Sequence, residues 1–213
     1  MWGKRDQVIF WITAYLPLIL IMIYRFIDSN DYFKRTKLVI YLAQHINKLL
    51  FDIIVFAFII VISLFLYRLV TNWYFNSIEK ELNKGGIGVT YYVREFRKVN
   101  VNDYTFFLMT LLLPLISLDH SSIINLLVTV LIISIVITIY VTTNFIIICP
   151  LFFTSGRYVY RGTISEHSKK EEELDPSLRK SVVIITNEKS PNLNNQFKGD
   201  KLIDNIYYIV KKQ

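Results

Sequence analysis

Charged side chains are scarce in this chain, and four stretches contain none. Asp, Glu, Lys and Arg make up 19% of the 213 residues, against about a quarter in a typical soluble domain. The charge-free stretches are 8–24, 53–67, 104–118 and 121–156. Because a helix needs roughly 20 apolar residues to cross a bilayer, this pattern argues against a soluble enzyme and against a disordered chain. It predicts an α-helical integral membrane protein that crosses the bilayer several times.

Cysteine, histidine and the motifs of catalysis are almost missing as well. Cys149 is the only cysteine, which leaves no intrachain disulfide and no cysteine-based metal site. The three histidines fall in three separate segments, and the glycine-rich 85–88 lacks the Lys-Ser/Thr of a phosphate-binding loop. We therefore expect no enzyme activity, no catalytic residue, no cofactor and no metal site.

We predict four transmembrane helices, which form a membrane domain over residues 1–156. Their ranges are about 8–27, 49–70, 104–118 and 123–148. Three prolines are assigned structural roles, because a proline inside a helix removes a hydrogen bond and bends it. Pro17 and Pro114 are expected to kink the first and third helices, and Pro150 to follow a break after the fourth.

Two connecting segments have amphipathic patterns of their own. Residues 38–48 predict a helix on the outer membrane interface that continues into the second span. The link 71–103 is expected to be cytoplasmic. There the second helix continues to Leu82, and an amphipathic helix resting on anionic lipid or on a partner protein begins at Val89.

The distribution of Lys and Arg predicts the orientation. With four spans and the N-terminus inside, the cytoplasmic side receives 12 of these residues and the outer side four, or five with Arg25. Positive residues favour the cytoplasmic side, so both termini are expected in the cytoplasm. The cluster from Lys34 to Lys48 conflicts with this rule, because the arrangement leaves it outside. Asp52, at the start of the second span, is expected to pair with Lys48 at the membrane boundary.

The last 57 residues, 157–213, predict a small cytoplasmic C-terminal module that contains β-structure. Short strands are expected at 158–160, 181–186 and 206–210, with turn-prone stretches between them. A module this small is marginal as a free domain, so it should lean on the spans, on other copies of the chain or on a partner.

Lipid or partner contacts are expected on aromatic and basic side chains of the cytoplasmic segments. Aromatic residues suit the headgroup layer, and basic residues attract anionic lipid. The candidates are Trp73, Tyr92, Arg94, Phe96, Arg97, Lys98, Tyr207 and Tyr208.

A series of short motifs runs through nearly the whole chain. They are Ala14–Ile19, Asn102–Tyr104, Thr110–Asp119, Pro150–Phe152, Gly156–Tyr160, Val183–Thr186 and Gly199–Tyr207. Their order resembles the KwaA family, the membrane component of the Kiwa anti-phage defence system. Cys149 is a departure, because Asn is expected at this position in the family.

The resemblance implies a non-enzymatic subunit of the bacterial inner membrane that assembles into a homo-oligomer, with a tetramer favoured. It implies that this subunit senses phage-induced membrane disturbance and anchors a cytosolic DNA-binding partner similar to KwaB, without binding nucleic acid itself. Two other functions remain open from the residues alone. One is a small oligomeric channel or pore, and the other is an immunity protein against a membrane-active peptide.

Overall fold

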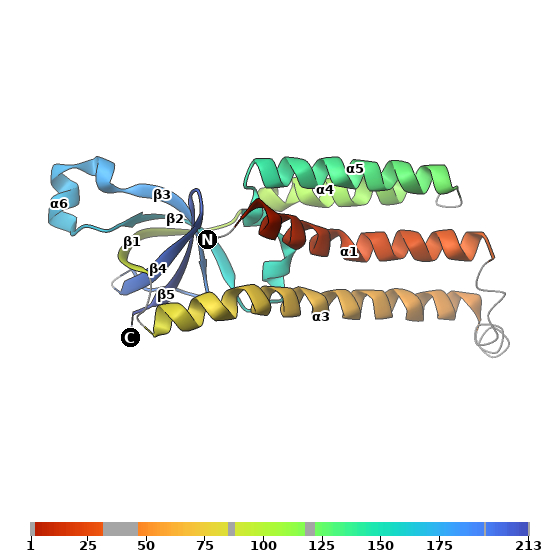
Figure 1. The fold of residues 1–213 in the computed structure, drawn as a ribbon, viewed down its shortest axis with the longest axis horizontal. Helices are drawn as coiled ribbons and strands as arrows, with labels where there is room; N and C mark the ends of the chain where they lie inside the picture. Colours follow the sequence, from red (N-terminus) through yellow and green to blue (C-terminus); the bar gives the residue numbers. More distant parts are fainter. Residues whose placement is uncertain (1–2, 32–46, 85–87, 118–121, 194, 213) are drawn as a thin grey trace.

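The computed structural model describes residues 3–31, 47–84, 88–117, 122–193 and 195–212. Long helices form one end of the molecule and a β-barrel forms the other (Figure 1). Both chain ends lie at the barrel end of the helices (Figure 1). The membrane-type helices and the β-containing tail that the sequence predicts are therefore both present.

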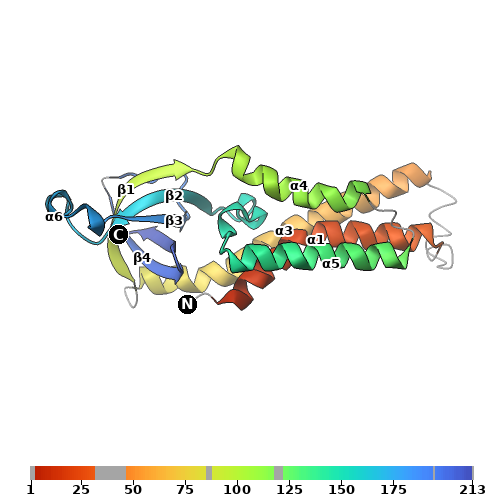
Figure 2. The same ribbon diagram turned by 90° about the horizontal axis from the view of Figure 1, so that it is seen from above.

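Within the described residues, three helices are long and apolar enough to cross a membrane. They are α1 (Lys4–Ser29), α3 (Lys48–Asn83) and α5 (Ile123–Thr142). At 1.5 Å per residue they are about 39, 54 and 30 Å long, against a hydrocarbon core of about 30 Å. The 17-residue helix α4 (Val101–Ser117) runs alongside them (Figure 2). Three such helices are consistent with the predicted helical membrane class, and a fourth span is not among them. Helix α3 continues past its apolar part to Asn83, as predicted.

Aromatic and hydroxyl side chains join the helices. The ring of Trp11 on α1 stacks on that of Tyr140 on α5, with 4.2 Å between the centroids. Thr110 on α4 lies 2.9 Å from the hydroxyl of Tyr15 and 3.2 Å from that of Tyr140. These contacts bring α1, α4 and α5 together around hydroxyl pairs that need no charge, which suits a low-dielectric surrounding.

Helix α5 ends at Thr142, six residues before the end that its apolar run predicts. Asn144 adopts a left-handed backbone conformation with φ of 51°, which a helix cannot continue through. Its Oδ1 accepts a hydrogen bond of 2.8 Å from Nε2 of Gln7. Two short 3-10 helices follow, η2 (Ile146–Ile148) and η3 (Pro150–Phe153), and Pro150 occupies the first position of η3.

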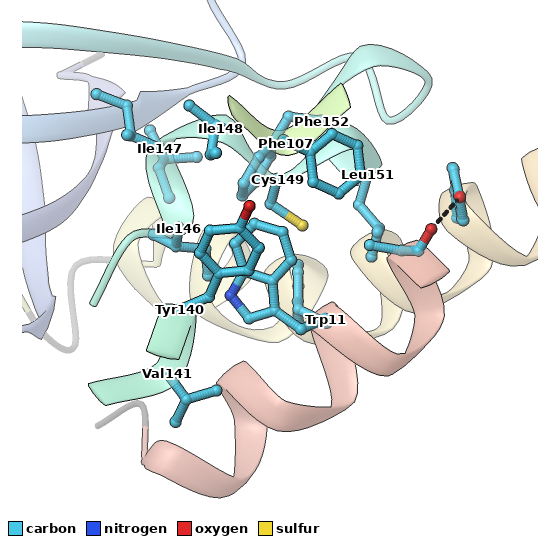
Figure 3. Close-up of a cluster of buried hydrophobic side chains, with 14 of the residues drawn as sticks. Trp11, Phe107, Tyr140, Val141, Ile146, Ile147, Ile148, Cys149, Leu151 and Phe152 are labelled. Carbon is cyan, nitrogen blue, oxygen red and sulfur yellow. Dashed lines mark hydrogen bonds between the residues drawn. The ribbon is translucent and has the colours of Figure 1, made fainter. Parts of the chain in front are cut away.

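The two short helices form an apolar layer between the long helices and the barrel. Figure 3 shows Cys149 surrounded by side chains from the helices and from η2 and η3. Cys149 is 1% exposed, and its neighbours Ile148 and Leu151 are fully buried. Segment η3 contacts α1, α3 and β2, so this layer packs against both parts of the molecule.

Five strands close into a barrel in the order β1-β2-β3-β5-β4. Neighbouring strands are antiparallel except for β3 and β5, which are parallel. This order with one parallel pair is that of an OB fold, a five-stranded Greek-key barrel. The strands are β1 (Val89–Lys98), β2 (Tyr158–Ser165), β3 (Lys180–Thr186), β4 (Gln196–Ile203) and β5 (Ile206–Lys211). Helix α6 (Lys169–Leu174) and the 3-10 helix η4 (Pro176–Leu178) connect β2 to β3.

The strands predicted at 158–160, 181–186 and 206–210 are confirmed as parts of β2, β3 and β5. The amphipathic helix expected from Val89 is wrong, because this segment is strand β1. It pairs with β2 and β4, so the barrel is built from two regions of the sequence that α4 and α5 separate.

At the start of α3, the ion pair expected between Asp52 and Lys48 is replaced by other contacts. Nζ of Lys48 lies 3.1 Å from a carboxylate oxygen of Asp28 at the end of α1. Asp52 instead accepts a hydrogen bond from the hydroxyl of Tyr24. The interfacial helix expected over 38–48 falls almost wholly outside the described residues, as do positions 85–87.

Candidate functional site at the junction of helices and barrel

The last turns of α3 present one face to the barrel. Asn72, Phe75, Asn76, Glu79 and Leu82 recur at three- and four-residue intervals, which places them on one side of a helix. The rings of Phe75 and of Tyr208 on β5 stack with 5.0 Å between their centroids. Phe75 is fully buried and Leu82 is 1% exposed. The part of α3 beyond its apolar run is therefore packed directly on the barrel.

Arg157, just before β2, is the centre of this contact. It is 6% exposed, and its guanidinium donates hydrogen bonds to Oδ1 of Asn72 at 2.8 Å and to Oδ1 of Asn76 at 2.9 Å. The same group lies 3.4 Å from Oε2 of Glu79 and 5.2 Å from the centroid of the Phe75 ring. A planar guanidinium can make all of these contacts at once because its donors point in fixed, different directions.

Glu79 extends the contact to two further barrel segments. Its carboxylate accepts hydrogen bonds from the hydroxyl of Tyr208 at 3.0 Å and from Nδ2 of Asn187 at 2.8 Å. Burial, and then the charge of Glu79, raise the pKa of Tyr208 above its ordinary value, so its hydroxyl stays a donor. We call these residues the junction cluster: Asn72, Phe75, Asn76, Glu79, Arg157, Asn187 and Tyr208.

A second set of polar contacts ties the start of α1 to the same region. The hydroxyl of Tyr74 on α3 donates to Asp6 at 2.9 Å. Asn144, which already binds Gln7, lies 3.5 Å from Oδ2 of Asp204 in the β4–β5 turn. Helix α3 thus contacts the barrel side directly through hydrogen bonds, whereas α1 is linked to the β4–β5 turn through Asn144, which follows α5. In the described part of the chain, no group of three or more His, Cys, Asp or Glu side chains is placed to hold a metal ion.

Three of the predicted contact residues are exposed. Trp73 lies on α3 with 68% of its surface accessible. The Arg97 side chain is 77% exposed and pairs with Glu95 at 2.5 Å. Lys98 is exposed at the end of β1. These three side chains are placed where lipid or a partner can reach them, and their role as contacts stays a prediction.

Arg94 is engaged inside the barrel module. Its guanidinium contacts both carboxylate oxygens of Glu172, with distances between 2.6 and 3.0 Å. The Glu172 side chain has no exposed surface, and it also binds Arg179 at 2.9 Å. Tyr92 lies beneath the Arg94 guanidinium at 5.1 Å. Arg94 therefore anchors α6 to β1, so the basic face expected from the helical reading does not form.

The remaining predicted contact residues belong to barrel or junction packing. Phe96 is half-buried and packs edge-on against Tyr160 and Phe197. Tyr207 is 6% exposed and Tyr208 is fully buried. Strand β5 lies between β3 and β4 in the closed barrel, and α3 covers its Tyr208 side. Neither tyrosine is accessible to a partner in this structure, which corrects the sequence-based expectation.

The sequence reasoning did not single out Arg157 or Glu79. A signal was present, because Asn72, Asn76 and Glu79 form a polar stripe on α3 just beyond its apolar part. Of the prolines, Pro17 lies inside α1 and Pro114 inside α4, as predicted.

The Glu172 contacts predict a dependence of barrel stability on pH. Hydrogen bonds from Arg94 hold the pKa of Glu172 at about 2, well below its ordinary value. A lowered pKa in the folded state stabilises the barrel above the unfolded value of about 4.3, and this contribution is lost as the pH falls toward 2. We expect Glu172→Gln to lower the unfolding free energy by about 1–3 kcal/mol at pH 7. Between pH 5 and 3, the unfolding free energy of this variant should change less with pH than that of the parent. Thermal unfolding followed by circular dichroism across this range checks it. If the stability of the variant changed with pH as steeply as that of the parent, the prediction would be contradicted.

Comparison with known proteins identifies a family that the chain matches. A family model described as the anti-phage protein KwaA matches residues 6–208. No curated protein and no solved structure matches the chain. The family match includes the whole junction cluster, and of the long helices and the barrel it leaves out only the start of α1 and the end of β5.

Proposed function

The chain belongs to the KwaA family of anti-phage proteins, and from this membership we propose that it is a non-enzymatic inner-membrane subunit of a bacterial defence complex. It crosses the membrane four times, with both termini in the cytoplasm, and assembles into a homo-oligomer, with a tetramer favoured. It senses disturbance of the membrane by a phage and anchors a cytosolic DNA-binding effector similar to KwaB.

The observation that carries this proposal is the continuity of α3 from its apolar part to the barrel. Its 36 residues form one helix of about 54 Å, which exceeds the bilayer core by about 24 Å. The excess length lies against the barrel and is fixed there by Arg157 and Glu79. A tilt or shift of α3 in a disturbed membrane therefore moves the barrel with it. This coupling supports a sensor that acts through a partner and needs no chemistry of its own.

The exposed apolar faces of the helices support assembly in a bilayer. On α3, Phe58 and Phe65 are each 65% exposed, and on α5 Leu127 and Leu131 are 62% and 60% exposed. Such surface is covered by lipid tails or by other copies of the chain. In a homo-oligomer, other copies cover part of this apolar surface and lipid tails cover the rest.

Co-expression with the proposed KwaB-like soluble partner tests the function. We expect a tagged chain to retain that protein through detergent purification, and the host to resist infection only when both are produced. Plaque counts with both genes, and with each gene alone, give the readout. Full protection without the soluble protein would contradict the proposal. Ion flux through the purified chain in liposomes, with no partner retained, would favour the channel.

Labelling of introduced cysteines tests the orientation. Burial raises the pKa of the Cys149 thiol to about 12, so the native chain should take up little maleimide and Cys149 can stay in place. We expect Asn192→Cys and Lys212→Cys to react with a membrane-impermeant maleimide only after the cells are opened. Ser29→Cys is the control, because Ser29 ends α1 on the side away from the barrel, and it should react in intact cells. The reverse pattern would contradict the proposed topology.

A further inference from the structure

A cavity of about 360 Å³ opens at the junction beside the cluster already described. It lies between the end of β1, the start of β2 and the first turn of α4. Three cationic side chains line it, Lys98, Arg157 and Lys189, and no Asp or Glu is among its lining residues. Tyr104 and Phe152 supply part of its remaining wall. The cavity thus combines positive charge with aromatic surface.

Arg157, one of the lining residues, also has an unpaired hydrogen-bond donor. Two of its guanidinium nitrogens bind Asn72, Asn76 and Glu79, but its buried Nε has no hydrogen-bond partner in the described part of the chain. Buried N–H groups are almost always paired, so an unpaired one calls for an explanation. Because this Nε has almost no exposed surface, it adds positive charge behind the cavity wall and does not itself reach a ligand in the cavity.

Two of the three positive charges at the cavity have no carboxylate partner. Lys98 and Lys189 are both exposed, and neither forms an ion pair among the described residues. Glu79 is the carboxylate that faces Arg157, and it already accepts hydrogen bonds from Tyr208 and Asn187. The cavity therefore has a surplus of positive charge.

We propose that this cavity binds a phosphate group. A guanidinium and two ammonium groups with no opposing carboxylate in the lining match the charge and the several acceptor oxygens of a phosphate. The cavity lies where the helices leave their apolar segments, so the headgroup of an anionic phospholipid is one source. Free phosphate from the cytoplasm is the other. The lipid source rests on the proposed membrane placement, whereas phosphate binding itself does not.

Occupancy of the cavity would place a negative charge beside Arg157, which is also the centre of the junction. A ligand that binds only the assembled junction stabilises it by mass action. Binding of phosphate therefore strengthens the attachment of the barrel to α3, and its loss weakens this attachment. The composition of the inner leaflet would then act directly on the element that we propose to transmit the signal.

The test compares two double variants that each remove two positive charges. Lys98→Gln with Lys189→Gln alters the cavity and keeps Arg157 and the junction intact. Lys169→Gln with Lys170→Gln alters α6, which lies at the far end of the barrel from the helices (Figure 1). Native mass spectrometry of the detergent-purified protein measures retention of added phosphatidylglycerol, with phosphatidylcholine as the uncharged comparison. We expect the cavity variant to bind phosphatidylglycerol about tenfold more weakly than the parent, and the α6 variant to bind like the parent.

A second arm measures the thermal shift that inorganic phosphate produces relative to chloride at equal ionic strength. Stabilisation of the parent and the α6 variant, but not of the cavity variant, assigns the site to free phosphate if lipid retention is equal in all three. Loss of lipid retention in the cavity variant alone assigns it to the headgroup. Equal behaviour of the two double variants in both arms overturns the proposal. These readouts use neither plaques nor a partner, so they separate this inference from the defence function.

Discussion

Replacement of Arg157 by Ala is expected to lower the unfolding free energy of the junction by about 2–3 kcal/mol. Breaking a buried ion pair by removing one partner costs about 3–5 kcal/mol, and the 25% exposure of the Glu79 side chain reduces this value. The loss also leaves Asn72 and Asn76 without the guanidinium that they bind. Arg157→Lys should recover only part of the stability, because one ammonium cannot reach all three acceptors.

The native cysteine reports this change directly. Cys149 is 1% exposed in the apolar layer beside the junction, so a fluorogenic maleimide should react with it only when the layer opens on heating. We expect the Arg157→Ala curve to shift to lower temperature. Arg97→Ala is the matched control, because its exposed pair with Glu95 is worth about 0–1 kcal/mol. Coincident curves for the two variants would show that the junction does not hold the barrel in place.

The same variant separates folding from signalling. If α3 transmits membrane disturbance through the junction, cells with Arg157→Ala should lose protection at temperatures where the protein is still folded and membrane-bound. Lys180→Ala, which removes an exposed ion pair with Glu166, should protect like the parent. Protection that is retained by a folded Arg157→Ala protein would place the sensing element elsewhere.

The long helices could be predicted from the sequence because their signal is local. A charge-free apolar run needs no tertiary partner to specify a helix in a bilayer, where each backbone group is satisfied within the segment. The ranges expected for α1 and for the apolar part of α3 therefore agree with the structure. The end of α5 was misplaced because Asn144 ends the helix through contacts with Gln7 and Asp204, which are 137 and 60 residues away.

The sequence predicts a helix where strand β1 forms, because a β-bulge gives the apolar residues a spacing that also fits a helix. Tyr91 and Val93 point into the barrel with the period of two that a strand requires. The register then shifts between Val93 and Glu95, which brings Phe96 back to the same barrel core. The step of three from Val93 to Phe96 fits a helix equally well. Only the pairing with β2 and β4, far along the chain, decides between the two.

The junction was beyond sequence reasoning for a similar reason. Arg157 and its partners on α3 are about 80 residues apart, and no local pattern links them. The sequence places Tyr208 on a short strand of a small C-terminal module, which favours a surface contact. Closure of the barrel and the approach of α3 bury it instead.

Gly162→Ala is expected to open the seam between β1 and β2. A Cβ atom at this position would overlap the carbonyl oxygen of Glu95 and lie 2.6 Å from Cδ1 of Ile184. The backbone of β1 has to move, because the nearest obstacle is a backbone oxygen and not the end of a flexible side chain. Glu95 lies directly after the register shift in β1. Insertion of a methyl group into such a site costs about 1–3 kcal/mol, and the upper end applies where backbone is the obstacle.

The matched control for Gly162→Ala is Gly156→Ala. A Cβ there meets nothing within 4 Å, but the φ of +70° strains an alanine by about 1 kcal/mol. Amide hydrogen exchange should therefore show loss of protection across β1 and β2 in the Gly162 variant and near-parent protection in the Gly156 variant. Because β1 leads directly into α4, its release also frees one helix from the barrel while the Arg157 contact with α3 persists. If defence survives Gly162→Ala but not Arg157→Ala, the signal passes through α3 and does not require α4.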